Sequence, residues 1–127
     1  MLGPAEPTRL LIVDDERVIA DTLATIFAQA GYETRAVYSA EEALALIDGW
    51  VPNLALLDVV LPGMNGIDLA IRLKAEVPGC GLTLFSGHFA TSGLLESARR
   101  NGHTLNVIPK PIHPTELLNL LASQQMN

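Results

Sequence analysis

A continuous apolar run that ends in a carboxylate constrains the fold of this chain more than any other stretch. Leu54-Ala55-Leu56-Leu57 leads directly into Asp58, and Pro62-Gly63 and Asn65-Gly66 then interrupt the pattern. The run suits a fully buried strand, and the interruption is typical of a loop. In open parallel α/β sheets, ligands bind at the carboxyl ends of the strands. We therefore expect Asp58 to end a central strand and to be the chemical centre of the molecule.

Apolar runs and helical periodicities alternate along the chain. The expected strands cover residues 9–13, 33–38, 54–58, 81–85 and 105–108, and the expected helices cover 17–30, 39–49, 66–77, 92–100 and a last segment from Pro114. Five strands that alternate with five helices predict an α/β fold, a doubly wound parallel sheet with right-handed crossovers and helices on both faces. The charged strand 33–38 and the proline-bounded strand 105–108 suit the two edges of this sheet.

Local signals mark the ends of several helices. Ser39 and Glu42 have the spacing of a capping box, in which each side chain accepts a hydrogen bond from the other residue's backbone N–H. Pro114 suits a first helical position. Segment 92–100 has the weakest helical pattern, so we expect the most mobile helix there.

Length, charge and cysteine content narrow the class of protein. With 127 residues, the chain is long enough for one domain with its own core and too short for two. The net charge of −6 argues against nucleic-acid binding, and no apolar window is long enough to predict a membrane span. The lone Cys80 fits a reducing compartment, so we expect a cytoplasmic protein. Residues 1–8 do not resemble a signal peptide and predict a short disordered lead-in.

Charged and hydroxyl side chains recur at or just past the ends of four expected strands: Asp14 and Asp15, Asp58, Ser86 and Lys110. Parallel strands end at one edge of the sheet, so we expect these side chains to converge. Two carboxylates about 4 Å apart repel by about 1 kcal/mol in water and about 4 kcal/mol at an effective dielectric of about 20. Mg²⁺, which prefers oxygen ligands, would relieve this repulsion.

Such a set of side chains suits phosphoryl transfer, which depends mainly on positioning and charge neutralisation. Asp58 could attack phosphorus and form an acyl phosphate, while Ser86 and Lys110 contact the phosphoryl oxygens. Each residue taken alone has a simpler interpretation. Asp14 or Asp15 could cap the helix that follows, Ser86 could be a turn residue, and Lys110 could be a solvated charge. The combination, rather than any single residue, favours a functional site.

In these motifs the chain resembles the receiver domain of two-component response regulators. The resemblance covers about residues 9–121 and rests on the motifs in this order and spacing: Asp14-Asp15, Asp58 with Leu61-Pro62-Gly63-Met64-Asn65-Gly66, Ser86-Gly87 and Lys110-Pro111. It implies a flavodoxin-like fold with strand order 2-1-3-4-5. The receiver domain would cover residues 9–123 after the lead-in 1–8.

The resemblance also implies a phospho-accepting switch in a phosphorelay, with Mg²⁺ as cofactor. Asp58 would receive a phosphoryl group from a phosphohistidine of a sensor histidine kinase or phosphotransfer protein. Asp15, Asp58 and the backbone carbonyl of Val60 would hold the metal directly, and Asp14 would act through water. The domain would have no separate turnover substrate, so we do not expect an enzyme in that sense.

The remaining implied features concern the phosphoryl group and the partners. Ser86 would follow the phosphoryl group inward, and Lys110 would bridge to it. The bond between Lys110 and Pro111 would be cis, which only about 5–6% of such bonds are. A downstream protein or a second copy would dock on the fourth helix, the fifth strand and the fifth helix, and this domain would contact neither nucleic acid nor membrane.

Two positions bear on signalling. Val107 stands where members of this family commonly carry Phe or Tyr, and an aliphatic side chain cannot report phosphorylation by ring rotation. His88, like Val60, falls at a position that lines the phosphorylation site in the family. We expect His88→Ala to change the lifetime of the acyl phosphate, and an unchanged lifetime at matched pH would contradict this.

Two other functions remain open from the sequence. A degenerate receiver could act as a phosphorylation-independent interaction module, which Val107 allows and the intact acidic residues oppose. A small phosphohydrolase could use Asp58 as its nucleophile, although we see no segment that would build a substrate-binding cap. Rapid turnover of a free phosphate ester would favour the hydrolase.

Overall fold

The computed structural model describes residues 6–86, 96, 99–100, 102, 105, 107–109 and 114–125. The elements in chain order are β1 Arg9–Val13, α1 Arg17–Gln29, β2 Glu33–Val37, α2 Ala40–Leu46, β3 Leu54–Asp58, α3 Gly66–Glu76, β4 Gly81–Ser86, β5 Val107–Pro109 and α5 Pro114–Gln125. The expected helix 92–100 and its expected mobility fall largely outside the described residues, although Glu96, Arg99 and Arg100 are helical.

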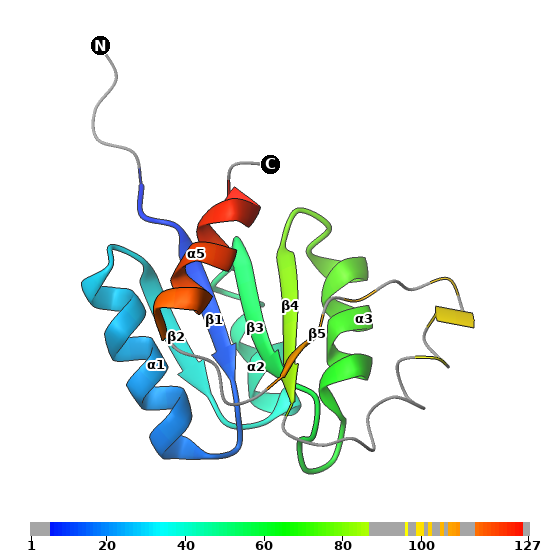
Figure 1. Cartoon of the computed structure of the whole chain (residues 1–127). Coiled ribbons are helices and arrows are strands. Elements are labelled where there is room, and N and C mark those ends of the chain that lie inside the picture. Colours follow the sequence, from blue (N-terminus) through cyan, green and yellow to red (C-terminus); the bar gives the residue numbers. More distant parts are fainter. Residues whose placement is uncertain are drawn as a thin grey trace.

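The five strands form one parallel sheet in the order β2-β1-β3-β4-β5, as Figure 1 shows. The predicted doubly wound fold, its strand order and its two edge strands are therefore confirmed. Parallel sheets covered on both faces need strands that are apolar on both sides, and Leu10 to Val13 are accordingly all fully buried.

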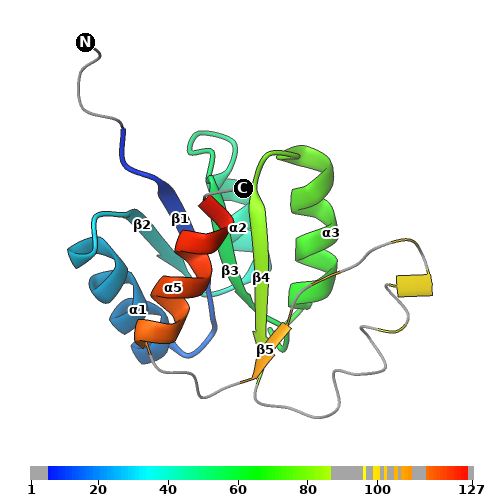
Figure 2. The same ribbon diagram turned by 45° about the horizontal axis from the view of Figure 1, so that its top comes forward.

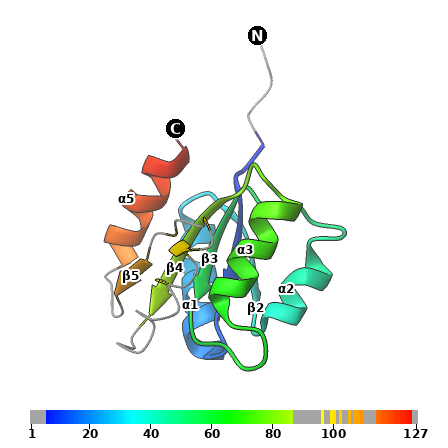
Figure 3. The same ribbon diagram turned by 90° about the vertical axis from the view of Figure 1, so that its right-hand side faces the viewer.

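Two hydrophobic clusters cover the two faces of the sheet. Leu11 and Val13 pack in the cluster that includes residues of α2 and α3, whereas Leu10 and Ile12 pack with residues of α1 and α5. Figures 2 and 3 show α1 and α5 on one side of the strands and α2 and α3 on the other. Because neighbouring residues of a strand point to opposite faces, one short apolar run supplies both clusters.

The start of α2 differs in one detail from the predicted capping box. The backbone N–H of Glu42 donates to the Ser39 hydroxyl at 3.1 Å, as predicted. The Glu42 carboxylate, however, accepts from the Ser39 hydroxyl at 3.0 Å and from the backbone N–H of Tyr38 at 3.2 Å. The extended backbone of Ser39, with φ −152° and ψ 161°, lets this carboxylate reach the preceding residue. The Glu42 side chain therefore accepts a hydrogen bond from the N–H of Tyr38 rather than from that of Ser39.

The two ends of the fold are described in part. Residues 1–5 of the expected lead-in lie outside the described residues, and the carbonyl of Thr8 already accepts from the N–H of Glu33 at 2.9 Å. Helix α5 begins at Pro114 as predicted. Leu117 is buried in the cluster that α1 and α5 share with the sheet, and Leu118 is partly buried against it, whereas the side chain of Leu121 lies outside the described part.

Candidate functional site

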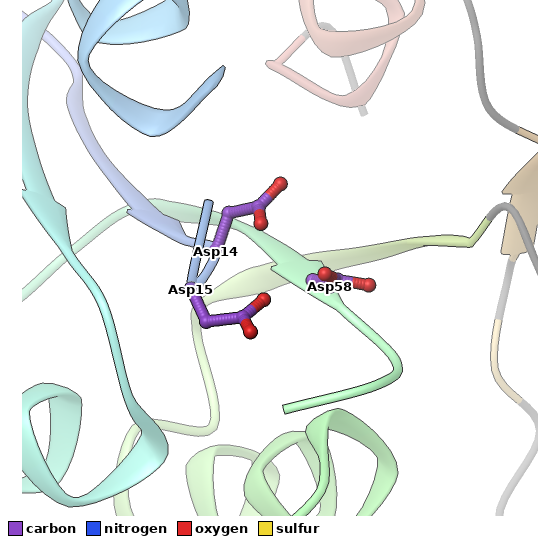
Figure 4. A group of neighbouring side chains, drawn as sticks. All are labelled: Asp14, Asp15 and Asp58. Atoms are coloured by element: carbon purple, nitrogen blue, oxygen red, sulfur yellow. The ribbon is translucent and has the colours of Figure 1, made fainter. Parts of the chain in front are cut away.

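The register of the two central strands brings the first two acidic motifs together. Val13 of β1 is the parallel partner of Leu57 of β3. The next residues along the two strands are Asp14 and Asp58, so both carboxylates leave the sheet at the same edge. Asp15 follows in the turn before α1. Figure 4 shows the three side chains beside one another at the ends of β1 and β3.

These three carboxylates form one compact group. One oxygen of each lies within 4.8 Å of the corresponding oxygens of the other two. Asp14 is fully buried and Asp58 is 4% exposed, while Asp15 is open to solvent. Charged groups that are withdrawn from water normally pair with opposite charges or coordinate metals. Three carboxylates that repel one another are thus held together, two of them buried and one facing solvent.

Backbone amides hold the two buried carboxylates in place. The N–H of Glu16 donates to Asp14 Oδ1 at 2.9 Å, and the N–H of Val60 donates to Asp58 Oδ1 at 3.2 Å. The N-cap residue of α1 is Glu16, so neither Asp14 nor Asp15 occupies the capping position that they could have filled. Each contact is made to the residue two positions further along, which orients the carboxylate from its own loop.

The donor set fits a hydrated divalent cation of the Mg²⁺ type. Such an ion takes oxygen ligands at about 2.0–2.1 Å, keeps several waters and needs only one or two carboxylates from the protein. The spacing of Asp14, Asp15 and Asp58 allows direct ligands together with one that acts through water. A divalent cation held by these carboxylates would offset the repulsion among their three negative charges.

The next strand, β4, ends in a hydroxyl residue beside the end of β3. Phe85 of β4 is the parallel partner of Asp58, and Ser86 is the next residue, buried at the end of β4. Ser86 in turn pairs with Pro109 of β5. Lys110 is the residue that follows β5 in the sequence. Lys110, Pro111 and His88 lie outside the described residues, as does the expected cis bond.

A further polar group joins β2 to α1 at this edge. The Tyr38 hydroxyl donates to Asp21 Oδ1 at 2.6 Å, and the Arg17 guanidinium carbon lies 4.1 Å from the centroid of the Tyr38 ring. The hydrogen bond to Asp21 raises the pKa of Tyr38, so the phenol stays protonated. The two contacts link the residue that follows β2 to the first two turns of α1.

Two contacts in this region were not predicted from the sequence. Gly66 begins α3 directly against the backbone of Asp58. Glu41 of α2 accepts a hydrogen bond from the N–H of Met64 in the loop after Asp58. A glycine at the start of the expected helix was a sequence signal for the contact of Gly66, because glycine often marks a close approach of two backbones. No local pattern links Glu41 to a loop that follows a different strand.

The sequence matches the response regulator receiver domain family over residues 10–122. The chain belongs to this family. Receiver domains are signalling switches of two-component systems. The conclusion agrees with the resemblance found in the motifs around Asp58.

The curated relatives of this receiver domain are response regulators. It is 38% identical to a response regulator receiver protein of Anaeromyxobacter sp. over 88% of this chain and 46% of that protein. It is 31% identical to the DNA-binding response regulator MtrA of Mycobacterium tuberculosis over 87% of this chain and 47% of that protein. The chain thus spans about half the length of the curated relatives it matches.

Solved structures share the fold of this receiver domain. A CheY-like response regulator receiver domain protein of Methanospirillum hungatei has a TM-score of 0.83 and 31% identity, with 93% of each chain covered. The receiver domain of NtrX from Brucella abortus has a TM-score of 0.75 and 35% identity, covering 91% of this chain and 95% of that one.

In the described residues of the receiver domain, no helix is long and apolar enough to cross a membrane.

Proposed function

We propose that this receiver domain, residues 9–123, accepts a phosphoryl group on Asp58 from a phosphohistidine of a sensor histidine kinase or phosphotransfer protein. The observation that carries the proposal is the group of three carboxylates within 4.8 Å at the carboxyl edge of the sheet. An oxygen of Asp58 would bond to phosphorus while the phosphorus–nitrogen bond breaks and its electron pair leaves with the imidazole. The product is an acyl phosphate.

Mg²⁺ is the proposed cofactor of this transfer. Asp15, Asp58 and the backbone carbonyl of Val60 would hold it, with Asp14 acting through water. When bound, the cation supplies positive charge next to the phosphoryl oxygens, where phosphoryl transfer needs it most. The burial of Asp14 and Asp58 supports this assignment, because charge interactions are stronger where water is excluded.

Ser86 and Lys110 are the proposed contacts of the phosphoryl oxygens. The position of Ser86, one residue past the partner of Asp58 on the neighbouring strand, supports its part. Lys110 is assigned from the sequence motif. Its ammonium would pair with the added negative charge.

The readout of the switch is proposed to use the surface of residues 92–100, β5 and α5, where a downstream protein or a second copy would dock. Val107 lies in β5, partly buried against the α2–α3 cluster. With valine at this position, signalling would depend on movement of the strand and its neighbours rather than on rotation of an aromatic ring.

Intact-mass measurement with a small phosphodonor and Mg²⁺ tests the proposal. We expect one added phosphoryl group, absent from Asp58→Asn and from a chelated sample. Asp48→Asn serves as the matched control, because Asp48 is an exposed aspartate outside the carboxylate group and should keep the adduct.

Other outcomes would contradict the proposal. No adduct and no Mg²⁺ binding would support a phosphorylation-independent interaction module. Rapid turnover of a free phosphate ester, without one phosphoryl group retained on Asp58, would support a phosphohydrolase.

A further inference from the structure

The loop between β3 and α3 carries Val60, a proposed metal ligand, and its two ends are firmly held. At its start, the N–H of Val59 donates to the carbonyl of Phe85 at 3.0 Å. At its end, the N–H of Gly66 donates to the carbonyl of Val59 at 2.9 Å, and Asn65 Oδ1 accepts from the N–H of Asp68 at 2.9 Å. Segment 61–64 lies between these two anchored ends.

Glu41 contacts this middle segment from a different element. Its Oε2 atom accepts a hydrogen bond from the backbone N–H of Met64 at 3.3 Å. The same oxygen lies against Gly63, where a Cβ carbon would be only 3.1 Å from it. Gly63 has φ +73°, a conformation that favours glycine, so the backbone at this point both bends sharply and admits the carboxylate.

The two neighbouring glutamates of α2 have separate tasks. Glu42 turns back to the Ser39 hydroxyl and the N–H of Tyr38 at the start of its own helix. Glu41 is therefore not needed for that cap and reaches across to the loop. Its carboxylate lies in the first turn of α2, where the helix dipole favours negative charge.

We propose that Glu41 is a positioning residue for the phosphorylation site: it holds segment 61–64 so that the Val60 carbonyl and Asp58 keep the geometry required for the metal. The proposal rests on the proposed function of Asp58. Glu41 acts through the backbone of Met64 and does not itself touch the metal or the phosphoryl group. What it supplies is an acceptor oxygen, and that oxygen is retained in glutamine.

Calorimetric titration of the full chain with Mg²⁺ separates this role from a mere charge effect. We expect Glu41→Ala to weaken binding by about threefold to tenfold, the range typical for one hydrogen bond of this kind. Glu41→Gln removes the same charge but keeps the acceptor, so its affinity should stay within about twofold of wild type. Asp48→Ala, which removes an exposed carboxylate just beyond the other end of α2, should behave like Glu41→Gln.

Hydrogen exchange of the Met64 amide, measured without metal, gives an independent readout. Exchange should be faster in Glu41→Ala and close to wild type in Glu41→Gln. Equal losses of affinity in the alanine and glutamine variants, or unchanged exchange in Glu41→Ala, would overturn the positioning role. A wild-type protein that binds no Mg²⁺ would instead contradict the proposed function, and the Met64 exchange would still decide whether Glu41 holds the loop.

Discussion

Gly66 and Asp58 are in direct backbone contact: a Cβ carbon at position 66 would lie 1.9 Å from the carbonyl oxygen of Asp58. The N–H of Gly66 also donates to the carbonyl of Val59 at 2.9 Å. The first turn of α3 is thus packed onto the end of the strand that carries the proposed phosphoacceptor. A methyl group at position 66 could be accommodated only if the backbone moved, because the nearest atoms belong to the backbone and not to a flexible side chain.

We therefore expect Gly66→Ala to lower the free energy of unfolding by about 1–3 kcal/mol, the usual cost of overpacking. Urea denaturation measures this change. Gly49→Ala is the matched control, since a Cβ carbon at Gly49 meets nothing within 4 Å. Its stability should change by no more than about 0.5 kcal/mol. Equal effects of the two substitutions would mean that the contact between Gly66 and Asp58 is not the cause.

The grouped carboxylates predict a stability effect that depends on Mg²⁺. Replacing Asp58 by Asn keeps the Oδ1 atom that accepts from Val60 and removes one of three repelling charges. Without metal, we expect Asp58→Asn to raise the free energy of unfolding by about 1 kcal/mol. With Mg²⁺, the wild type should gain stability and the variant should gain much less, because bound ligand stabilises only the state that binds it.

Thermal unfolding with and without Mg²⁺ measures both halves of this prediction. Asp48→Asn provides the control for a change in overall charge, and it should respond to Mg²⁺ as the wild type does. A larger Mg²⁺-dependent gain in Asp58→Asn than in wild type would argue against the carboxylate group as the metal site.

Cys80 should be chemically inert in the folded protein. The thiol is buried, and burial raises its pKa to about 12. The thiolate is the reactive form, so an alkylating reagent should label Cys80 slowly at pH 8 and rapidly after denaturation. Fast labelling of the native protein, followed by mass spectrometry, would show that the site opens readily.

The same pKa shift has a defined effect on stability at high pH. The folded state keeps the thiol proton up to a pKa of about 12, whereas the unfolded chain releases it above about 9. The unfolded state therefore binds fewer protons between these values, and the contribution of Cys80 to stability is lost as pH rises through this window. Cys80→Ser, which does not titrate there, should show a flatter decline between pH 9 and pH 12 in urea titrations.

The fluorescence of Trp50 should report on the amino-terminal ends of β1 and β2, at the opposite end of the strands from the carboxylates. Its indole N–H donates to Glu33 Oε2 at 2.9 Å, and the guanidinium carbons of Arg9 and Arg35 lie 5.7 and 5.8 Å from its ring centroid. Glu33 and Arg9 begin β2 and β1, and a five-residue strand separates them by about 15 Å from the site.

Mg²⁺ should consequently leave the Trp50 emission spectrum almost unchanged, whereas Glu33→Gln should shift it. Arg72→Gln, a substitution on the exposed side of α3 in an ion pair with Glu76, serves as a control that should leave the emission alone. A strong Mg²⁺-dependent change in Trp50 emission would indicate that the amino-terminal and carboxyl-terminal ends of the strands are coupled.

The sequence by itself determined the elements and the chemistry of the motifs. Strands such as Leu54–Asp58 could be predicted because a strand buried on both faces must be apolar throughout and must end where polar residues begin. Parallel topology then predicted that Asp14, Asp15 and Asp58 would meet, and their oxygens do lie within 4.8 Å of one another. These features depend on local patterns, or on the general rule that parallel strands end at one edge.

Only the tertiary structure decided which neighbours support that site. The carboxylate of Glu42 bonds to Tyr38 rather than to the N–H of Ser39, Glu41 crosses to Met64, and the start of α3 presses on the backbone of Asp58. The first contact depends on the extended backbone of Ser39, whereas the other two depend on distances between backbone segments that the packing of helices on the sheet sets. No periodicity along the chain encodes such distances, so the sequence predicted the site but not the contacts that hold it in place.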